Sequence, residues 1–293
     1  MRAAIYRAFQ SEPDVLLLDE PFSRLDDSGS EILQDMLMKR KNTGMGVTLI
    51  AEHRTEFLTD SLADKILPLQ PESRGELYSG SFRDILPQKN GGGVELQDSG
   101  MQFRGIRLFA GVDLHLLPGS VVGITGPNGS GKTTLGRIIA GLIKPTQGKV
   151  TRPPGMLSSL VHENPEKQLI CSAVGEEIDF ARRNYRLPHD YTKGLLRIFD
   201  LEHLQDSFPA NLSHGQQERT ALAAGLSMAP GLIVLDEPLQ GQDYIFRGRL
   251  KALIEQLKAA GRIILLIGHD SEFLHSAADN VYELSNGKLE PLP

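Results

Sequence analysis

The segment GPNGSGKT, residues 126–133, constrains the fold of this chain more than any other feature. The run VVGIT before it predicts a buried strand, and TLGRIIAGL, which follows it directly, predicts a helix. Glycines between a strand and a helix let successive backbone N–H groups turn inward around a polyanion, at the positive end of the helix. This context predicts a phosphate-binding loop rather than a glycine-rich turn with an incidental lysine.

Within that loop, Lys132 can reach the outer phosphates of a nucleotide and the Thr133 hydroxyl can bind Mg²⁺. ATP and Mg²⁺ are therefore the expected ligands. The candidate nucleotide-binding residues of the loop are Gly126, Asn128, Gly129, Ser130, Gly131, Lys132, Thr133 and Thr134.

A second apolar run, LIVLDEP (Leu232 to Pro238), ends in two adjacent acids. Parallel strands of an α/β sheet end at one edge, so we expect these acids beside the phosphate loop. Asp236 is then placed to hold Mg²⁺ together with Thr133, and Glu237 to polarise the attacking water as a general base. The alternative is that the two acids cap the helix that follows.

The pattern around these motifs is that of an α/β protein. A continuous apolar strand is followed by helical spacing, as in Gly248 to Ala260, and then by another buried strand, Ile263 to Ile267. Parallel strands joined by helical crossovers follow from this alternation.

An internal repeat of domain size runs through the chain. VLLLDEP near the N-terminus matches LIVLDEP, which places Asp236 217 residues after Asp19. Further matched pairs, the last with a one-residue gap, are Arg2 and Arg219, Pro13 and Pro230, Glu20 and Glu237, Asp26 and Asp243, and His53 and His269.

The first copy has no counterpart of residues 94–217, because Met1 matches Glu218. We expect a partial domain over residues 1–88, a linker over 89–93 that contains KNGGG, and a complete domain over 94–293. The working hypothesis is an internal start, or a split or truncated form of a longer tandem protein.

Composition restricts the partners. The net charge is −6, from 37 acidic and 31 basic residues without a basic stripe, so no nucleic-acid partner is expected. The single cysteine, Cys171, cannot form an internal disulfide and is expected to be buried. Apolar runs are only strand-length, far below the roughly 20 residues of a membrane helix, so any membrane work must pass through a partner.

Together these motifs resemble the ATP-binding cassette (ABC) ATPases, over nearly the whole chain. The resemblance implies a phosphate-loop fold with a RecA-like parallel sheet core and a helical subdomain. LSHGQ (Leu212 to Gln216) looks like the family signature, with His214 where glycine is usual. In that family, Ser213, Gly215 and Gln216 would contact the γ-phosphate bound by a second cassette. Read alone, Ser213 is an ordinary N-cap of the helix expected over Gln216 to Met228.

Four further residues take roles by the same resemblance. His269 resembles the switch histidine that contacts the γ-phosphate, Asp243 the aspartate that links paired sites, and Phe103 the aromatic that stacks on adenine. A structural histidine and a core phenylalanine are the alternatives. Glu163 falls where the family has a glutamine that touches Mg²⁺, so it is a candidate metal ligand of altered charge.

The stretch HENPEKQLICSAVGEEIDFA, residues 162–181, is similar to energy-coupling-factor and cobalt-type importer ATPases. In those proteins this segment contacts a transmembrane subunit; the alternative here is a solvated helix. The resemblance implies an ATPase on the cytoplasmic face of the cell membrane that powers an importer of a vitamin or metal ion. Such an ATPase would work with a transmembrane subunit and a second ATPase domain, either a homodimer partner or the missing N-terminal half. The alternatives are a soluble translation or repair ATPase and a truncated inactive fragment.

Overall fold

The computed structural model describes residues 7–19, 21–22, 25, 27–44, 46–52, 57–59, 61–66, 92–239 and 244–293. The chain divides into two compact units, each of which is considered separately. The smaller comprises Met1–Gly75 with Gln240–Tyr244, and the larger comprises Glu76–Leu239 with Ile245–Pro293. Residues 89–91 of the expected linker lie outside the described residues.

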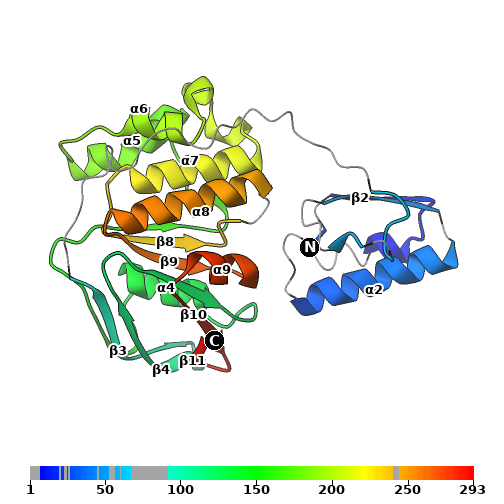
Figure 1. Ribbon diagram of the computed structural model, residues 1–293, viewed down its shortest axis with the longest axis horizontal. Coiled ribbons are helices and arrows are strands. Elements are labelled where there is room, and N and C mark those ends of the chain that lie inside the picture. Colours follow the sequence, from blue (N-terminus) through cyan, green and yellow to red (C-terminus); the bar gives the residue numbers. More distant parts are fainter. Residues whose placement is uncertain are drawn as a thin grey trace. The chain divides into compact units, whose positions relative to one another are not determined.

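The larger unit alternates strands and helices along the chain (Figure 1). Its strands are β3 (Val94–Phe103), β4 (Ile106–Leu116), β5 (Val121–Thr125), β6 (Gln147–Thr151), β7 (Ser158–Val161), β8 (Leu232–Asp236), β9 (Ile263–Ile267), β10 (Asn280–Ser285) and β11 (Lys288–Leu292). Its α-helices are α4 (Lys132–Ala140), α5 (Val174–Tyr185), α6 (Thr192–Ile198), α7 (His214–Leu226), α8 (Tyr244–Ala259) and α9 (Ser271–Ala277). Short 3₁₀ turns are η2 (Pro165–Lys167), η3 (Glu202–Leu204) and η4 (Pro209–Asn211).

The central sheet has six strands in the order β11-β10-β5-β9-β8-β7. Strands β10, β5, β9, β8 and β7 run parallel, and β11 is antiparallel at the edge. A separate antiparallel sheet has the order β4-β3-β6. The α/β fold with a parallel core is therefore confirmed, with antiparallel additions that make the sheets mixed.

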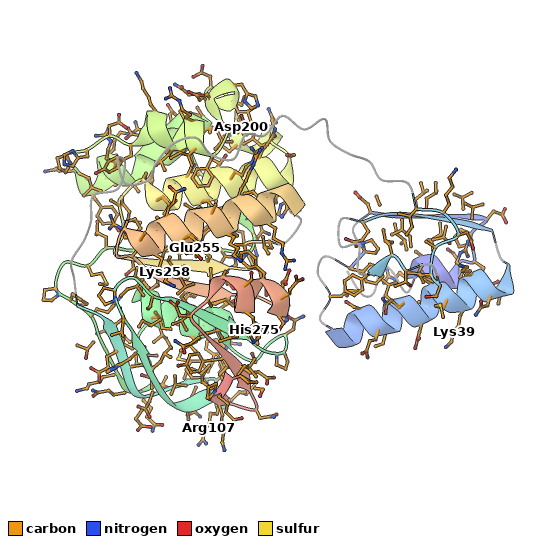
Figure 2. The ribbon with its side chains drawn as sticks, in the orientation of Figure 1. Lys39, Arg107, Asp200, Glu255, Lys258 and His275 are labelled. Atoms are coloured by element: carbon orange, nitrogen blue, oxygen red, sulfur yellow. The ribbon has the colours of Figure 1, made fainter. Side chains whose placement is uncertain are left out.

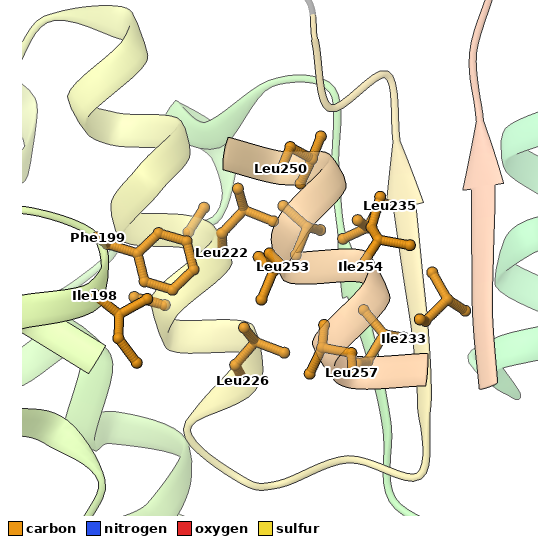
Figure 3. Close-up of a cluster of buried hydrophobic side chains, with 14 of the residues drawn as sticks. Ile198, Phe199, Leu222, Leu226, Ile233, Leu235, Leu250, Leu253, Ile254 and Leu257 are labelled. Carbon is orange, nitrogen blue, oxygen red and sulfur yellow. The ribbon is translucent and has the colours of Figure 1, made fainter. Parts of the chain in front are cut away.

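The central sheet is buried on both faces, as expected for parallel strands with helical crossovers. On one face, Ile233 and Leu235 of β8 pack against leucines of α7 and α8 (Figure 3). On the other face, Leu232 and Val234 pack with α4. Figure 1 shows β8 and β9 between α7 and α8 on one side and α4 on the other.

In the smaller unit, β1 (Val15–Asp19) pairs in parallel with β2 (Val47–Ala51), and α2 (Asp27–Thr43) connects them. Val15 pairs with Val47, and in the larger unit the matched residues Leu232 and Ile263 pair in the same way. The repeated motifs therefore form strand pairs of identical register. One face packs on α2 through a core of Leu16, Leu18, Phe22, Leu25, Leu33, Leu37 and Leu62.

Within the described ranges, no helix is both long and apolar enough to cross a bilayer.

Candidate functional site

The loop between β5 and α4 requires glycine at its first position. Gly126 has a φ of +139°, and an added Cβ would lie 2.3 Å from the backbone oxygen of Leu284. Gly131, the N-cap of α4, has a φ of +104° and supplies no side-chain cap. The N-cap residue therefore leaves the first N–H groups of α4 unsatisfied, and a helix N-terminus of this kind can bind an anion.

Two side chains of this loop fit a bound polyanion. Lys132 is buried, and its Nζ donates to the carbonyl oxygens of Gly126 at 2.7 Å and Pro127 at 3.0 Å. The Oγ of Ser130 is buried with no hydrogen-bond partner among the described residues. A buried hydroxyl that lacks a partner is costly, so a phosphate oxygen at this position would satisfy it.

Thr133 and Asp236 are brought together from α4 and β8. The Thr133 hydroxyl donates to Oδ2 of Asp236 at 2.7 Å, and Asp236 is 2% exposed. Burial raises the pKa of Asp236, the hydrogen bond from Thr133 opposes the shift, and the charge of Glu163 adds to it. A hydroxyl and a carboxylate at this spacing suit Mg²⁺, which binds few protein oxygens and completes its shell with water and phosphate.

Glu237 follows β8 in a conformation that non-glycine residues rarely adopt, with a φ of 53°. Its backbone N–H donates to the Ile267 oxygen at 2.8 Å, which fixes the residue at the tip of β9. Burial raises the pKa of the Glu237 carboxyl to about 7, although the charge of Lys132 opposes the shift. A carboxyl with this pKa can accept a proton from water near neutral pH.

His269 completes this cluster. Its Nε2 lies 2.8 Å from Oδ1 of Asn128, 3.4 Å from Nζ of Lys132 and 3.5 Å from Oε1 of Glu237. The strand ends of β8 and β9 thus place the carboxylate and the imidazole on one side of the phosphate loop.

The side-chain contacts that hold the loop after β7 were not predicted from the sequence. Nη2 of Arg137, on α4, lies 3.0 Å from Nε2 of His162. The Gln168 side chain accepts from the His162 N–H at 2.8 Å and donates to the Leu160 oxygen at 2.9 Å. The one sequence signal was the helical spacing of Arg137, four residues after Thr133 and so on the same face of α4. Glu163 itself is exposed.

The signature segment begins α7 with a capping box. The Ser213 Oγ accepts from the Gln216 N–H at 3.4 Å, and Oε1 of Gln216 accepts from the Ser213 N–H at 2.9 Å. His214 Nε2 lies 3.2 Å from Oε1 of Glu218, one turn further on, and the two residues form an ion pair when His214 is protonated. Gly215 is part of the first turn of this helix. The N-cap role expected of Ser213 is therefore present in the structure.

The remaining expected residues lie at the edges of the site or outside the description. Phe103 ends β3, is 57% exposed, and has the Arg104 guanidinium 5.3 Å from its ring centroid. It is therefore not a core residue. Asp243 and His53 lie outside the described residues. Cys171, expected to be buried, is only partly so, because it lies in the loop before α5.

The strand that leads into the phosphate loop is anchored from α8. Lys258, labelled in Figure 2, forms an ion pair with Asp279, whose Oδ2 accepts from the Val121 N–H at 2.9 Å. This bridge anchors the start of β5, the strand that leads into the phosphate loop.

Comparisons with known proteins identify ABC transporter proteins in each case. A family model described as ABC transporter matches residues 109–240. The energy-coupling factor transporter ATP-binding protein EcfA of Methanocaldococcus jannaschii is 31% identical over 216 residues, which cover 67% of this chain and 77% of EcfA. Among solved structures, cbiO1 of Clostridium perfringens, described as part of the ABC transporter complex cbiONQ, has a TM-score of 0.59 and 26% identity over 68% of this chain and 87% of cbiO1.

Longer relatives align with nearly the whole chain. An ABC transporter ATP-binding protein of Methanosarcina acetivorans is 28% identical over 325 residues, which cover 98% of this chain and 61% of the relative. A relative from Methanosarcina mazei is covered over 63% of its length. The chain therefore spans about three fifths of the length of these first curated relatives.

Proposed function

This chain belongs to the ATP-binding proteins of ABC transporters, and we propose that it binds and hydrolyses ATP to power an importer of the energy-coupling-factor type. The observation that carries the ATPase proposal is the convergence of three groups on one loop. Lys132 binds the loop carbonyls, Thr133 binds Asp236, and Glu237 lies 3.5 Å from His269.

The nucleotide would be held by the loop and its surroundings. The loop N–H groups, Ser130 Oγ and Lys132 would contact the phosphates, because Ser130 Oγ is buried without a partner among the described residues and the N-cap of α4 supplies no side chain. Phe103, exposed at the end of β3, would stack on adenine. The Ser213 segment, with Gly215 and Gln216, would contact the γ-phosphate bound by a second cassette.

Thr133 and Asp236 would hold Mg²⁺, with Glu163 nearby as a further carboxylate. When bound, the ion neutralises phosphate charge. Glu237 would accept the proton of the attacking water, because burial brings its pKa to about 7. His269 would hydrogen-bond the γ-phosphate and help to place that water.

The importer assignment is supported by the named relatives and by the segment after β7. EcfA is described as an energy-coupling factor transporter protein, and cbiO1 as part of the complex cbiONQ. We infer that the transmembrane subunit of such a complex is a partner, at the cytoplasmic face of the membrane. The second cassette would come from another copy of residues 94–293 or from a domain that includes residues 1–88. A vitamin or a metal ion is the proposed cargo.

The test separates binding from chemistry. Glu237→Gln removes the proton acceptor but keeps size and hydrogen bonding, so ATP hydrolysis should fall by about 100-fold or more while ATP affinity stays within a few-fold. Lys132→Ala should weaken ATP binding itself. Calorimetry with Mg-ATP and a phosphate-release assay measure the two effects. Full hydrolysis by Glu237→Gln would remove Glu237 from the base role, and wild-type affinity in Lys132→Ala would remove the loop from nucleotide binding.

A further inference from the structure

The side chain of Asn128 contacts a histidine that lies far from it in the sequence. Its Oδ1 lies 2.8 Å from Nε2 of His269, which follows it by 141 residues. Asn128 is exposed in the turn between β5 and α4, and His269 follows β9. The phosphate loop and the imidazole that is proposed to contact the γ-phosphate are therefore joined directly by these two side chains.

The backbone of His269 is fixed independently of this contact. The N–H of Gly268 donates to the Ile124 oxygen at 3.1 Å, which ties the end of β9 to β5. The N–H of His269 donates to the carboxylate of Glu237. What remains for side-chain contacts to decide is the orientation of the imidazole and the nitrogen that carries its proton.

Nε2 of His269 lies near both acceptors and a donor. Oδ1 of Asn128, at 2.8 Å, and Oε1 of Glu237, at 3.5 Å, are acceptors. Nζ of Lys132, at 3.4 Å, is a donor. A neutral imidazole carries one proton, so Nε2 either donates to an oxygen or accepts from the lysine. The choice between the two tautomers is therefore made at this nitrogen.

The distances favour a proton on Nε2. Its contact with Asn128 has the length of a normal hydrogen bond, whereas its contact with Lys132 is longer than the usual limit of about 3.2 Å. Lys132 also donates to the oxygens of Gly126 and Pro127, at 2.7 and 3.0 Å, which draws its ammonium group toward the loop backbone. A bare Nε2 would instead turn its lone pair toward the Asn128 oxygen, and this contact is repulsive.

We propose that Asn128 is a positioning residue, whose amide oxygen holds His269 in the tautomer that carries the proton on Nε2. This inference rests on the proposed function, in which His269 contacts the γ-phosphate. That role requires a donor, because ionised phosphate oxygens only accept hydrogen bonds. A bare Nε2 would point a lone pair at the phosphate and would bind an N–H of Lys132 in place of a phosphate oxygen.

The contact also prepares the site for the nucleotide. With the proton already on Nε2, the imidazole can exchange the Asn128 oxygen for a γ-phosphate oxygen by rotating, and no proton has to move between its two nitrogens. A donor that is set in advance needs no reorganisation during the reaction. Asn128 thus acts on hydrolysis through His269.

Nitrogen NMR of the imidazoles measures the tautomer directly, because protonated and bare ring nitrogens have well separated resonances. The full chain is labelled with isotope-enriched histidine and measured without nucleotide. The pH is about two units above the ordinary histidine pKa of about 6.5, so that an ordinary imidazole is neutral. His269→Gln removes one set of signals and so identifies those of His269. In the wild type, Nε2 of His269 should be the protonated nitrogen.

Two substitutions of similar size separate the amide oxygen from the bulk of the side chain. Asn128→Leu removes the acceptor, so the ratio of the tautomers should shift toward a bare Nε2 by about fivefold or more. Asn128→Asp keeps an acceptor and should keep Nε2 protonated. His115, whose Nε2 lies 2.8 Å from Oε1 of Glu95, is the internal control, and its signals should not change in either variant.

ATP hydrolysis connects the tautomer to the chemistry. Asn128→Leu should lower kcat by about tenfold while the Kd for ATP rises only a few-fold, because Lys132 and the loop backbone are kept. A side chain that only stabilised the loop would change the urea midpoint and leave kcat of the folded protein intact. Urea unfolding of Asn128→Leu beside the wild type separates the two roles.

A bare Nε2 in the wild type would overturn the proposal without any variant. So would an unchanged tautomer in Asn128→Leu, or a bare Nε2 in Asn128→Asp. A shifted tautomer with unchanged kcat in Asn128→Leu would remove Asn128 from the reaction. The spectra need no nucleotide, so the tautomer is decided even if the ATPase test above fails.

Discussion

At the scale of single residues, two glycines of the phosphate loop are required for different reasons. Gly126 has its backbone against Leu284, with 2.3 Å between an added Cβ and the Leu284 oxygen. Gly129 has a φ of +81° but open space around it. Alanine at 129 therefore adds only backbone strain, about 1 kcal/mol, whereas alanine at 126 adds strain and a collision with backbone, for about 3 kcal/mol.

We expect Gly126→Ala to lower the urea midpoint of the larger unit clearly more than Gly129→Ala does. Unfolding followed by circular dichroism, with both variants measured beside the wild type, gives the comparison. Equal midpoints for the two variants would contradict the packing of the loop against β10.

The single cysteine offers a second residue-scale prediction. Burial and the carboxylate of Glu177 raise the pKa of the Cys171 thiol to about 11. Glu177 accepts hydrogen bonds from the N–H groups of Ile170 and Cys171, at 2.8 and 2.7 Å. At pH 8 the thiolate fraction should be about 100-fold below that of an ordinary cysteine, so alkylation should be slow.

Glu177→Gln removes the negative charge and keeps an acceptor, so it should speed the reaction of Cys171 with iodoacetamide. Glu166→Gln, at an exposed carboxylate, serves as the control and should leave the rate unchanged. Mass spectrometry of the labelled chain measures both. An unchanged rate in Glu177→Gln would show that burial alone holds the pKa.

Some residues of the site could be identified from sequence because their spacing is local. Lys132 and Thr133 lie within one short motif, and Asp236 and Glu237 end one apolar run. The contact of Arg137 with His162 could not be found this way. It joins α4 to the loop after β7, and only the packed fold brings those two segments within hydrogen-bond distance.

At the scale of elements, the strands were predicted more accurately than the helix ends. Apolar runs bounded by turn residues gave Val121–Thr125, Leu232–Asp236 and Ile263–Ile267, which are the strands observed. Helix α8 begins at Tyr244 rather than at the expected Gly248, and its first turn already places Phe246 in the core cluster that contains Leu250. Tertiary contacts, not local periodicity, decide such ends.

The ends of α7 differ from those expected from the sequence. The expected helix ran from Gln216 to Met228, but the Ser213 cap starts it at His214 and it ends at Leu226. The order of β4, β3 and β6 was also not predicted, because antiparallel pairing across a distant segment leaves no local signal.

Ser213 serves as a cap and, in our proposal, as a γ-phosphate contact, and substitutions can separate the two. Ser213→Asp keeps a good N-cap, so stability should stay within about 0.5 kcal/mol, while its charge should repel a phosphate and reduce ATP hydrolysis strongly. Ser213→Ala should lose about 1 kcal/mol of stability. Urea unfolding and phosphate release are measured on both; full hydrolysis in Ser213→Asp would leave Ser213 with the cap role alone.

At the scale of the whole molecule, the proposed ATPase needs a phosphate loop and a signature from different cassettes. If two chains pair through residues 94–293, hydrolysis per chain should rise with protein concentration, because the composite site exists only in the pair. Phosphate release per chain, measured from nanomolar to micromolar protein, tests this prediction. A rate per chain that does not change over this range would contradict pairing.

Pairing in trans also predicts rescue between two inactive variants. Lys132→Ala chains lack a working loop, and Ser213→Asp chains lack a working signature, so each should be inactive alone. In a mixed pair the loop of the Ser213→Asp chain faces the signature of the Lys132→Ala chain, which restores one of two sites. Random pairing of equal amounts in a two-fold dimer then gives about a quarter of the wild-type sites. A mixture of Lys132→Ala chains with Glu237→Gln chains is the control. Both changes lie on the phosphate-loop side, so every site of a mixed pair carries one of them and the mixture should stay inactive. A mixture of the first two variants that also stays inactive would mean that loop and signature do not meet between chains.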